Sequence, residues 1–246
     1  MAEPHLGWRF GTQPDDHVAP PCDEVVGDSL DRIDREITTC FACPRLVAWR
    51  EETATAKRAS FATDDYWGRP LPGFGDQDAR LLVVGLAPAA HGGNRTGRVF
   101  TGDRSADWLY RAMHRAGYAN QPTSVARDDG LTLSGAWVNA AVRCAPPANK
   151  PTPAERDTCL PYLRRELRLL TSVRVVVVLG AFAAQVVAGA LGLRPRPRFG
   201  HLAEHPLPDG RTLLCSYHPS QQNTFTGTLT EAMLDAVFSR ARELGA

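Results

Sequence analysis

The chain has 246 residues, a net charge of +1 at pH 7 and 43% hydrophobic residues, which suits one sizeable domain with its own core. No stretch reaches the roughly 18 apolar residues of a membrane span, and no basic segment followed by an apolar run opens the chain, so neither a span nor a signal peptide is expected. The sequence therefore predicts a cytoplasmic protein with reduced cysteines, and its overall charge says nothing about nucleic acid.

The chain begins with a polar, proline-containing segment without an apolar period. We expect a flexible N-terminal arm over 1–25 and one domain over 26–246. Residues 53–78 are rich in Gly, Pro and aromatic residues and are expected to be irregular. The predicted strands are Leu81–Leu86, Ala136–Val142, Val173–Leu179 and Thr212–Tyr217, and the predicted helices are 27–38, 104–117, 153–170, 181–192 and 228–244.

The alternation of strands and helices indicates an α/β fold. Val173–Val178 is a nearly continuous β-branched run, typical of a central strand in a parallel sheet that is covered on both faces. We predict three α/β/α layers around a central, mainly parallel four-stranded sheet. Because ligands bind at the carboxyl ends of the strands in such sheets, the polar segments after the strands are expected to form one crevice.

The cysteines indicate a metal centre. Four of the six form two pairs, Cys40 with Cys43 and Cys144 with Cys159. The first pair is a Cys-x-x-Cys-Pro motif, and the second brackets a proline-rich loop that follows a predicted strand. Four thiolates from two distant segments suit a [4Fe–4S] cluster or a structural zinc, and both remain open. Cys22 and Cys215 are interpreted as ordinary structural thiols.

Charged residues are unevenly distributed. Residues 15–36 are acidic, whereas 143–174 carry many arginines and few acids. This basic segment either faces phosphates or forms a solvated helix face, and both interpretations remain open.

Three polar segments follow predicted strands. The first, at 85–103, reads GLAPAAHGGNRTGRVFTGD, and its small residues allow a ligand close to the backbone. It lacks the phosphate-loop pattern of nucleoside triphosphatases. Asn139 lies in an otherwise apolar strand, where it is either a satisfied core amide or a partner for a planar heterocycle. His218 heads a His-Pro-Ser sequence after the last strand, at the same edge of the sheet.

Together these segments resemble the uracil-DNA glycosylase superfamily. The resemblance rests on the segment at 85–103, on Asn139 followed by VRCAPP, and on HPSQQNTFTGTLT at 218–230, and it covers roughly 40–243. Within the superfamily the chain is most similar to the family 5 enzymes, which are iron–sulfur proteins of type b. The resemblance implies a nucleoid-associated DNA repair enzyme that flips out uracil, hydrolyses its N-glycosidic bond and leaves an abasic site.

The resemblance also implies site residues. The cluster ligands would be Cys40, Cys43, Cys144 and Cys159, the base would be bound by Phe100, Asn139 and the backbone of Leu86 and Ala87, and the duplex would be entered by Gln221, Gln222 and Asn223. His218 would donate a hydrogen bond to the pyrimidine O2. Ala87 stands where better-known members carry a carboxylate that positions the attacking water, so Asn94 or Asp103 is expected to replace it.

Two further expectations concern specificity and chemistry. Ala89 stands where uracil-specific members have a blocking tyrosine, which predicts activity on hydroxymethyluracil, ethenocytosine or hypoxanthine as well. Lys57 and Lys150 are the only lysines and fall outside the matched catalytic motifs, which predicts a monofunctional enzyme without a Schiff base.

We expect a monomer that binds damaged DNA and no membrane; contact with a sliding clamp and the preference for single or double strands stay open.

Two other classes of protein compete with this interpretation. The first is a damaged-DNA-binding iron–sulfur or zinc protein without catalysis. The second is a flavodoxin-like redox protein, although the chain carries no recognisable cofactor motif.

Overall fold

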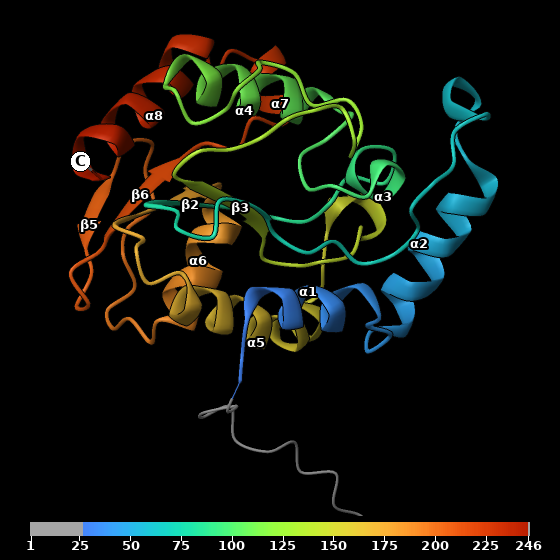
Figure 1. Cartoon of the computed structure of the whole chain (residues 1–246), viewed down its shortest axis with the longest axis horizontal. Helices are drawn as coiled ribbons and strands as arrows, with labels where there is room; N and C mark the ends of the chain where they lie inside the picture. Colours follow the sequence, from blue (N-terminus) through green and yellow to red (C-terminus); the bar gives the residue numbers. More distant parts are fainter. Residues whose placement is uncertain (1–26, 246) are drawn as a thin grey trace, which may run out of the picture.

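The computed structural model describes residues 27–245, which build a six-stranded sheet with the order β1-β3-β2-β4-β6-β5 (Figure 1). The strands are β1 (Phe74–Gly75), β2 (Leu81–Gly85), β3 (Ala136–Ala140), β4 (Val175–Leu179), β5 (Glu204–Pro206) and β6 (Thr212–Ser216). The four central strands are parallel, as predicted. The edge strands β1 and β5 are antiparallel additions that the sequence did not indicate, because two or three partly exposed residues carry no alternating pattern.

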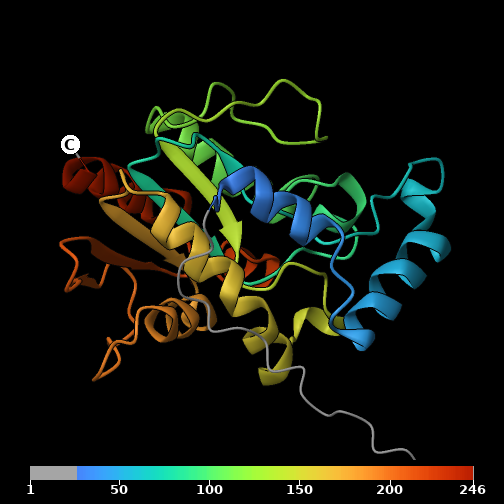
Figure 2. The same ribbon diagram turned by 60° about the horizontal axis from the view of Figure 1, so that its bottom comes forward.

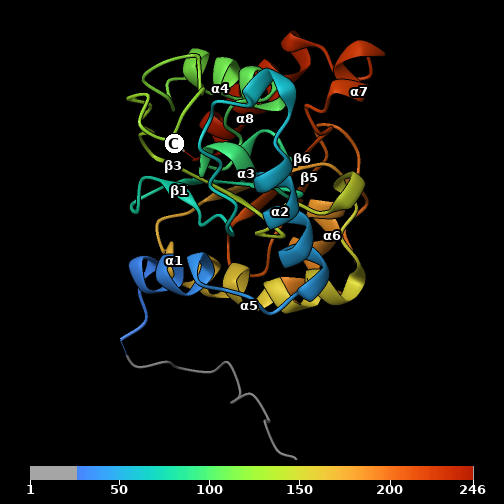
Figure 3. The same ribbon diagram turned by 90° about the vertical axis from the view of Figure 1, so that its right-hand side faces the viewer.

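Helices cover both faces of the sheet, which confirms the three-layer α/β/α architecture (Figures 1 and 2). One face carries α4 (Arg104–Arg115) and α8 (Glu231–Gly245), and the other carries α1 (Leu30–Thr38), α5 (Pro153–Leu169) and α6 (Ala181–Ala190). The longer helix α2 (Pro44–Ala56) lies beside these layers. Four short helical elements complete the structure, namely η1 (Ala59–Phe61), α3 (Gly93–Thr96), η2 (Pro147–Asn149) and α7 (Gln221–Phe225). Figure 3 looks at the side of the molecule on which α2 and α3 lie.

The side chains of the central strands alternate between two apolar cores. In β2, Leu81 and Val83 pack with α4 and α8, whereas Leu82 and Val84 pack with α1, α5 and α6. Because both faces are covered, these strands are apolar throughout rather than alternately polar. The sheet is thus a rigid support for the loops that follow its carboxyl ends.

Helix α5 begins with the capping box that its sequence indicates. The Thr152 hydroxyl accepts from the backbone N–H of Glu155, and the Glu155 carboxylate accepts from the backbone N–H of Thr152. The same carboxylate forms a bidentate pair with Arg45 of α2, at 2.8 and 2.7 Å. The start of α5 is therefore tied to α2.

Helix α2 lies inside the part of the chain where the sequence indicated no helix. Pro44 occupies its first turn, a position that proline favours. Its buried residues are Leu46, Arg50 and Thr53, of which only one is apolar. An amphipathic period is therefore missing from the sequence, although the helix packs against the rest of the protein.

Two arginines of the basic segment have carboxylate partners that are at least partly buried. Arg165 of α5 pairs with Asp28 at 2.7 Å and also with Glu36 of α1, and α1 and α5 lie side by side in Figure 2. Arg143 forms a buried pair with Glu166. The interpretation of this basic segment as a phosphate-facing surface is wrong for Arg143 and Arg165, because both guanidiniums already have carboxylate partners.

Some expectations concern other parts of the chain. The N-terminal arm over 1–25, with Cys22, lies outside the described residues. Cys215 is a buried core thiol of β6, as expected. Within residues 27–245, every helix is too short or too polar to cross a membrane.

Candidate active site and cysteine cluster

A pocket of about 370 Å³ opens where the parallel strands β2 and β6 end. It brings together six of the ten residues predicted for catalysis, base binding and DNA binding, namely Leu86, Ala87, Phe100, Asp103, His218 and Gln221. These residues come from the segment after β2 and the segment after β6, which are far apart in the sequence. The expected convergence at the carboxyl edge of the sheet is thus observed for these two segments, but not for Asn139, the third member of the expected crevice.

Two rings stand close together in this pocket. The ring centroids of Phe100 and His218 are 6.0 Å apart, with an angle of 32° between the planes. Phe100 is 9% exposed and has a φ of +48°, so its backbone adopts the left-handed conformation that non-glycine residues rarely take. This aromatic wall is therefore held in place by the surrounding structure.

His218 is positioned by its own loop. Its backbone carbonyl accepts a 2.9 Å hydrogen bond from the side-chain amide of Asn223, and Ser220 caps the short helix α7. The Nδ1 atom of His218 is buried and has no hydrogen-bond partner. Burial lowers the pKa of His218 to about 4, so the imidazole is neutral at pH 7. A neutral imidazole can donate one hydrogen bond to a ligand.

Asp103 has a structural and a potential chemical role. Its Oδ1 accepts from the backbone N–H of Ala106 at 3.0 Å and so caps α4. Its Oδ2 lies so close to Gly92 that a Cβ there would be 2.1 Å away. Burial raises the pKa of the Asp103 carboxyl above its ordinary value. One carboxylate oxygen therefore holds the helix while the side chain also lines the pocket.

Asn94 is not part of the pocket lining, contrary to expectation. It is fully buried in α3, and its Nδ2 donates to the backbone carbonyl of Arg50 in α2 at 3.1 Å. The side chain thus joins two helices. This geometry leaves Asp103, rather than Asn94, as the polar group of the segment 85–103 that faces the pocket.

Asn139 also lies outside the pocket lining. Its strand register places it beside Val84, and its Nδ2 donates to the Glu166 carboxylate of α5 at 2.8 Å. Glu166 also binds Arg143, so the three polar side chains form one fully buried network. The amide is tied to the core through its Nδ2, yet the network leaves the Arg143 Nε and Nη1 and the Glu166 Oε1 without partners, so it is only partly satisfied. The Oδ1 atom of Asn139 remains buried without a partner.

The three predicted duplex-contacting residues differ in their surroundings. Gln221 lines the pocket, and Gln222 is exposed on α7. Asn223 instead turns inward to the carbonyl of His218. It is therefore a positioning residue for the histidine loop.

Asn149 is a pocket residue that the sequence interpretation missed. It lines the pocket from η2, between the two cysteines of the second pair, and has a φ of +56°. Asn tolerates this left-handed conformation better than most residues. The neighbouring Ala148 has a φ of +52°, so two successive residues hold an unusual backbone at the rim of the site. The Pro-Pro-Ala-Asn sequence of this loop was the available signal.

The two cysteine pairs line one small cavity between α2 and α5. Its lining includes Cys40, Cys43, Cys144 and Cys159. Arg50, which is 1% exposed, donates to the Cys144 Sγ at 3.2 Å and to the backbone carbonyl of Cys40 at 3.1 Å. Its Nε has no hydrogen-bond partner. The Glu51 carboxylate lies 3.6 Å from its Nη2, and the thiolates of a metal centre would add further negative charge beside this buried guanidinium.

The buried thiols would have to lose their protons to bind a metal. Burial raises the pKa of Cys144 to about 12 and that of Cys159 to about 11, so without a metal both are protonated at neutral pH. Within residues 27–245, no three His, Cys, Asp or Glu side chains are arranged to hold a single metal ion. A [4Fe–4S] cluster binds each cysteine to a different iron and accepts a wider spacing than the about 2.3 Å Zn–S bonds of one zinc ion.

A family model described as the uracil DNA glycosylase superfamily matches residues 72–242. The chain belongs to this superfamily. It is 53% identical over 220 residues to a type-5 uracil-DNA glycosylase of Mycobacterium bovis, across 88% of this chain and 82% of that protein. It is 54% identical over 219 residues to the type-5 enzyme of Mycobacterium leprae, across 88% and 96% of the two chains. It is 52% identical over 209 residues to that of Thermus thermophilus, across 85% and 94%.

Membership in the superfamily confirms the resemblance on which the site was first interpreted. The structure adds that Ala87 and Ala89 both line the pocket. The segment directly after β2 therefore presents two methyl groups to the pocket. Ala87 stands in place of the carboxylate, and Ala89 in place of the tyrosine, that other members of the superfamily are expected to carry. Asp103, further along the same segment, places a carboxylate in the pocket lining.

Proposed function

We propose that this protein is a monofunctional uracil-DNA glycosylase of base excision repair. It binds uracil that has left the DNA helix, hydrolyses the N-glycosidic bond and leaves an abasic site. The observation that carries the proposal is the convergence of Phe100, Asp103 and His218 on one pocket of about 370 Å³. This volume falls within the range of about 300–1,000 Å³ for small-ligand sites.

The Phe100 ring offers a flat surface on which the flipped base stacks, and the backbone of Leu86 and Ala87 lines the pocket beside it. Because the segment carries small side chains, the base approaches the main chain closely. Stacking on an aromatic side chain stabilises an unpaired base by about 1–3 kcal/mol. This interaction offsets part of the cost of flipping, which is a few kcal/mol.

His218 stabilises the leaving group. As the C1′–N1 bond breaks, its electron pair moves into uracil, and negative charge collects on the carbonyl oxygens. The neutral imidazole donates a hydrogen bond to O2, and this hydrogen bond becomes stronger as the negative charge develops. A neutral donor fits the low pKa that burial gives this histidine.

Asp103 positions the attacking water. The water oxygen bonds to C1′, its proton passes to the Asp103 carboxylate, and the uracil anion then takes a proton from solvent. Asp103 lines the pocket together with His218, whereas Asn94 does not. We therefore assign the role to Asp103 and a structural role to Asn94.

Neither lysine supports a lyase activity. A Schiff base requires an amine at C1′ of the sugar. Lys57 ends α2 and Lys150 follows η2, and neither lines the pocket. The products are thus free uracil and an intact strand with an abasic site.

The pocket also supports a broader substrate range. Ala89 forms part of its wall, so a substituent at C5 of the pyrimidine meets a methyl group rather than a phenol ring. Hydroxymethyluracil, ethenocytosine and hypoxanthine are the bases to test. Gln221 and Gln222 of α7 face the DNA in this proposal, and one subunit contains every residue it requires.

The four cysteines would hold a structural [4Fe–4S] cluster. The cluster would bring negatively charged thiolates next to Arg50 and link the start of α2 to the loop over 145–158. Its ligands lie outside the pocket, so it takes no part in bond breaking.

The experiment is base release from a labelled duplex with one uracil opposite guanine, with and without alkali after incubation. Strand cleavage only after alkali is the expected result. Cleavage without alkali, or a borohydride-trapped adduct, would contradict a monofunctional enzyme. Absence of release by protein with an intact metal centre, for uracil and the three other bases, would favour a non-catalytic damaged-DNA-binding protein.

A further inference from the structure

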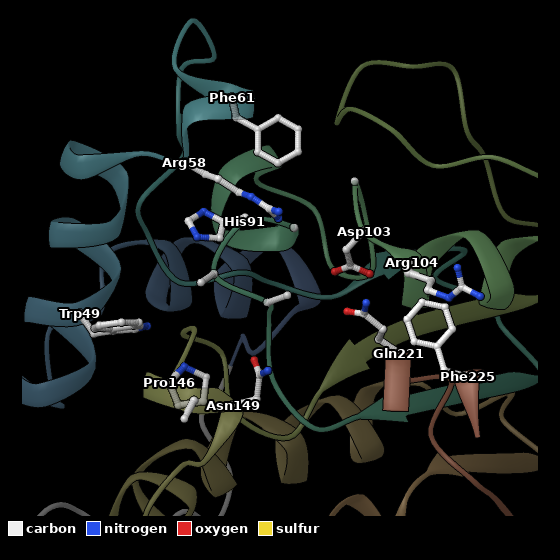
Figure 4. A pocket seen from close by; sticks show the side chains of 15 residues that line it. Trp49, Arg58, Phe61, His91, Asp103, Arg104, Pro146, Asn149, Gln221 and Phe225 are labelled. Atoms are coloured by element: carbon white, nitrogen blue, oxygen red, sulfur yellow. The ribbon is translucent and has the colours of Figure 1, made fainter. Parts of the chain in front are cut away.

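A groove of about 550 Å³ adjoins the base pocket (Figure 4). The groove and the pocket share part of their walls, namely Ala89, Asp103, Arg104, Asn149 and Gln221. Trp49 from α2, Arg58 and Phe61 lie on one side of the groove, and Phe225 from α7 lies on the other. The uracil pocket proposed above does not use these four residues.

We propose that this groove binds the nucleotide next to the flipped one on the same DNA strand, in an unpaired state. Its base would stack on Phe61, and its phosphate would lie at Arg58. This inference rests on the proposed function, because the neighbouring pocket must hold the flipped base. Because the groove and the pocket share a wall, a ligand in the groove lies directly beside the flipped nucleotide in the pocket. The next nucleotide of the same DNA strand is covalently connected to it and therefore fits this position.

The charge of the groove suits a phosphate. Arg58 is exposed and, within residues 27–245, has no carboxylate partner. Arg104, on the opposite side, bonds only to the Thr224 hydroxyl at 3.1 Å and lies over the Phe225 ring at 4.3 Å. Both guanidiniums therefore retain their charge for a ligand. Arginine at such a place contributes the salt-dependent part of DNA binding.

Phe61 is held as a flat platform. The Arg95 guanidinium lies 3.9 Å from the centroid of its ring and covers one face. Arg95 is itself fixed by Asp64 at 2.7 Å and by the backbone carbonyls of His91 and Gly102 at 2.8 and 3.0 Å. The Phe61 ring lines the groove (Figure 4). A base can stack on a ring of this kind only when it has left the helix.

Trp49 offers the groove an unused hydrogen-bond donor. Its indole nitrogen is buried and has no hydrogen-bond partner, and Figure 4 shows the nitrogen end of the ring directed into the groove. Buried donors of this type are rarely left unpaired, and a ligand acceptor would reach this one once the side chains that cover it shift. Ala90 and Gly92, which have small or no side chains, also line the groove and leave room for the nucleotide.

The test compares three uracil-containing substrates: a fully paired duplex, one with the 5′ neighbour of uracil mispaired, and one with the 3′ neighbour mispaired. We expect mispairing on one side to raise kcat/KM of the wild-type protein at least about fivefold over the fully paired duplex, because the mispaired neighbour enters the groove without first giving up a Watson–Crick pair. Phe61→Ala should bring this ratio close to one, and Trp49→Phe, which keeps the aromatic ring and removes the donor, should reduce it.

The phosphate contact is tested separately by the salt dependence of binding. DNA with a tetrahydrofuran abasic site serves as the probe, because it cannot be turned over. Arg58→Gln should weaken binding and reduce the slope of log Kd against log salt by about 0.7–0.9. Arg196→Gln removes the same charge from the exposed loop between α6 and β5, outside the groove, and should leave the slope unchanged.

The two proposals fail in different ways. Release of uracil without any effect of mispairing on either side, or a ratio that Phe61→Ala leaves intact, would overturn the groove assignment alone. An Arg58→Gln slope equal to that of Arg196→Gln would overturn the phosphate contact. If no substrate loses its base, the proposed function itself is wrong.

Discussion

The ring of Phe100 lies against the backbone of Gly85, the last residue of β2. A Cβ at Gly85 would come within 2.4 Å of the Phe100 Cζ and 2.6 Å of its Cε2. No real Cβ tolerates such distances, so the aromatic wall of the pocket depends on the missing side chain. The end of a central strand thereby sets the position of the base-stacking ring.

Gly85→Ala is expected to displace the Phe100 ring and to lower kcat/KM for uracil release about tenfold or more, since loss of base stacking costs about 1–3 kcal/mol. Gly189→Ala is the matched control, because a Cβ in that helical position meets nothing within 4 Å. Steady-state kinetics on both proteins check this. Equal activity of the two variants would show that the ring has room to move.

His218→Ala should reduce kcat by two to three orders of magnitude, because one preorganised donor at a developing anion contributes about 2.7–4 kcal/mol to the barrier. Single-turnover rates at saturating enzyme measure the effect. His205→Ala removes a half-buried imidazole of β5 that bonds to the Arg198 carbonyl, and it should keep the wild-type rate. A loss of less than tenfold in His218→Ala would remove the histidine from the central role.

The pH dependence of the rate should report Asp103. The ionised carboxylate is the active form, and burial raises its pKa above the usual value of 3.8, so the rate should fall as the pH drops through that raised pKa. His218 remains neutral until about pH 4. Asp103→Asn keeps an acceptor for the N–H of Ala106 and so preserves the cap of α4. Asp103→Asn should lose most of its activity, and its remaining rate should no longer fall at low pH. If the rate of this variant still fell at the same pH as that of the wild-type protein, another group would be responsible for the titration.

Asn94→Ala separates a structural residue from a catalytic one. The variant loses the hydrogen bond to the Arg50 carbonyl and should be less stable by about 1–3 kcal/mol, the cost of leaving a buried carbonyl without its donor. The kcat of the folded fraction should stay within about twofold of wild type. Denaturant unfolding and kinetics on the same sample test both statements. A large fall in kcat with unchanged stability would return Asn94 to the active site.

Metal content distinguishes cluster from zinc. We expect iron and acid-labile sulfide in the proportions of one [4Fe–4S] cluster per chain, and loss of the iron in Cys144→Ser together with lower thermal stability. Cys215→Ser is the matched control, because it changes a buried thiol of the sheet core away from the cavity. One zinc per chain without iron would identify a structural zinc site instead.

The sequence was sufficient for the elements whose pattern reflects their burial. Val175–Leu179 is apolar at every position and is a central strand, and Thr152 with Glu155 marks the start of α5. Helix α2 escaped prediction because Arg50, a charged residue, occupies its buried face. Its partners, Cys40 and Cys144, are adjacent only in three dimensions, so no local pattern announces them.

The same limit explains the site. His218 and Asp103 could be predicted because each follows a strand end in a recognisable motif. Asn94 and Asp103 look equivalent in the sequence, yet the four-residue helix α3 turns Asn94 towards α2 while the start of α4 leaves Asp103 at the pocket. Asn139 could be assigned to one face of the sheet by alternation, but its partner Glu166 lies on a helix that is distant in sequence. The sequence thus indicated the residue types of the site but not the directions in which their side chains point.

The strand order has a consequence for synthesis of the chain. Asp103 follows β2 and His218 follows β6, and β4 separates these two strands in the sheet. A chain emerging from the ribosome therefore presents Asp103, the carboxylate proposed to position the water, long before His218, the proposed hydrogen-bond donor, and the sheet is complete only when its distant strands pair. Until then only Asp103 of the two proposed catalytic residues has been made. We therefore expect uracil excision to begin only after β6 has paired and the loop of His218 has closed beside it.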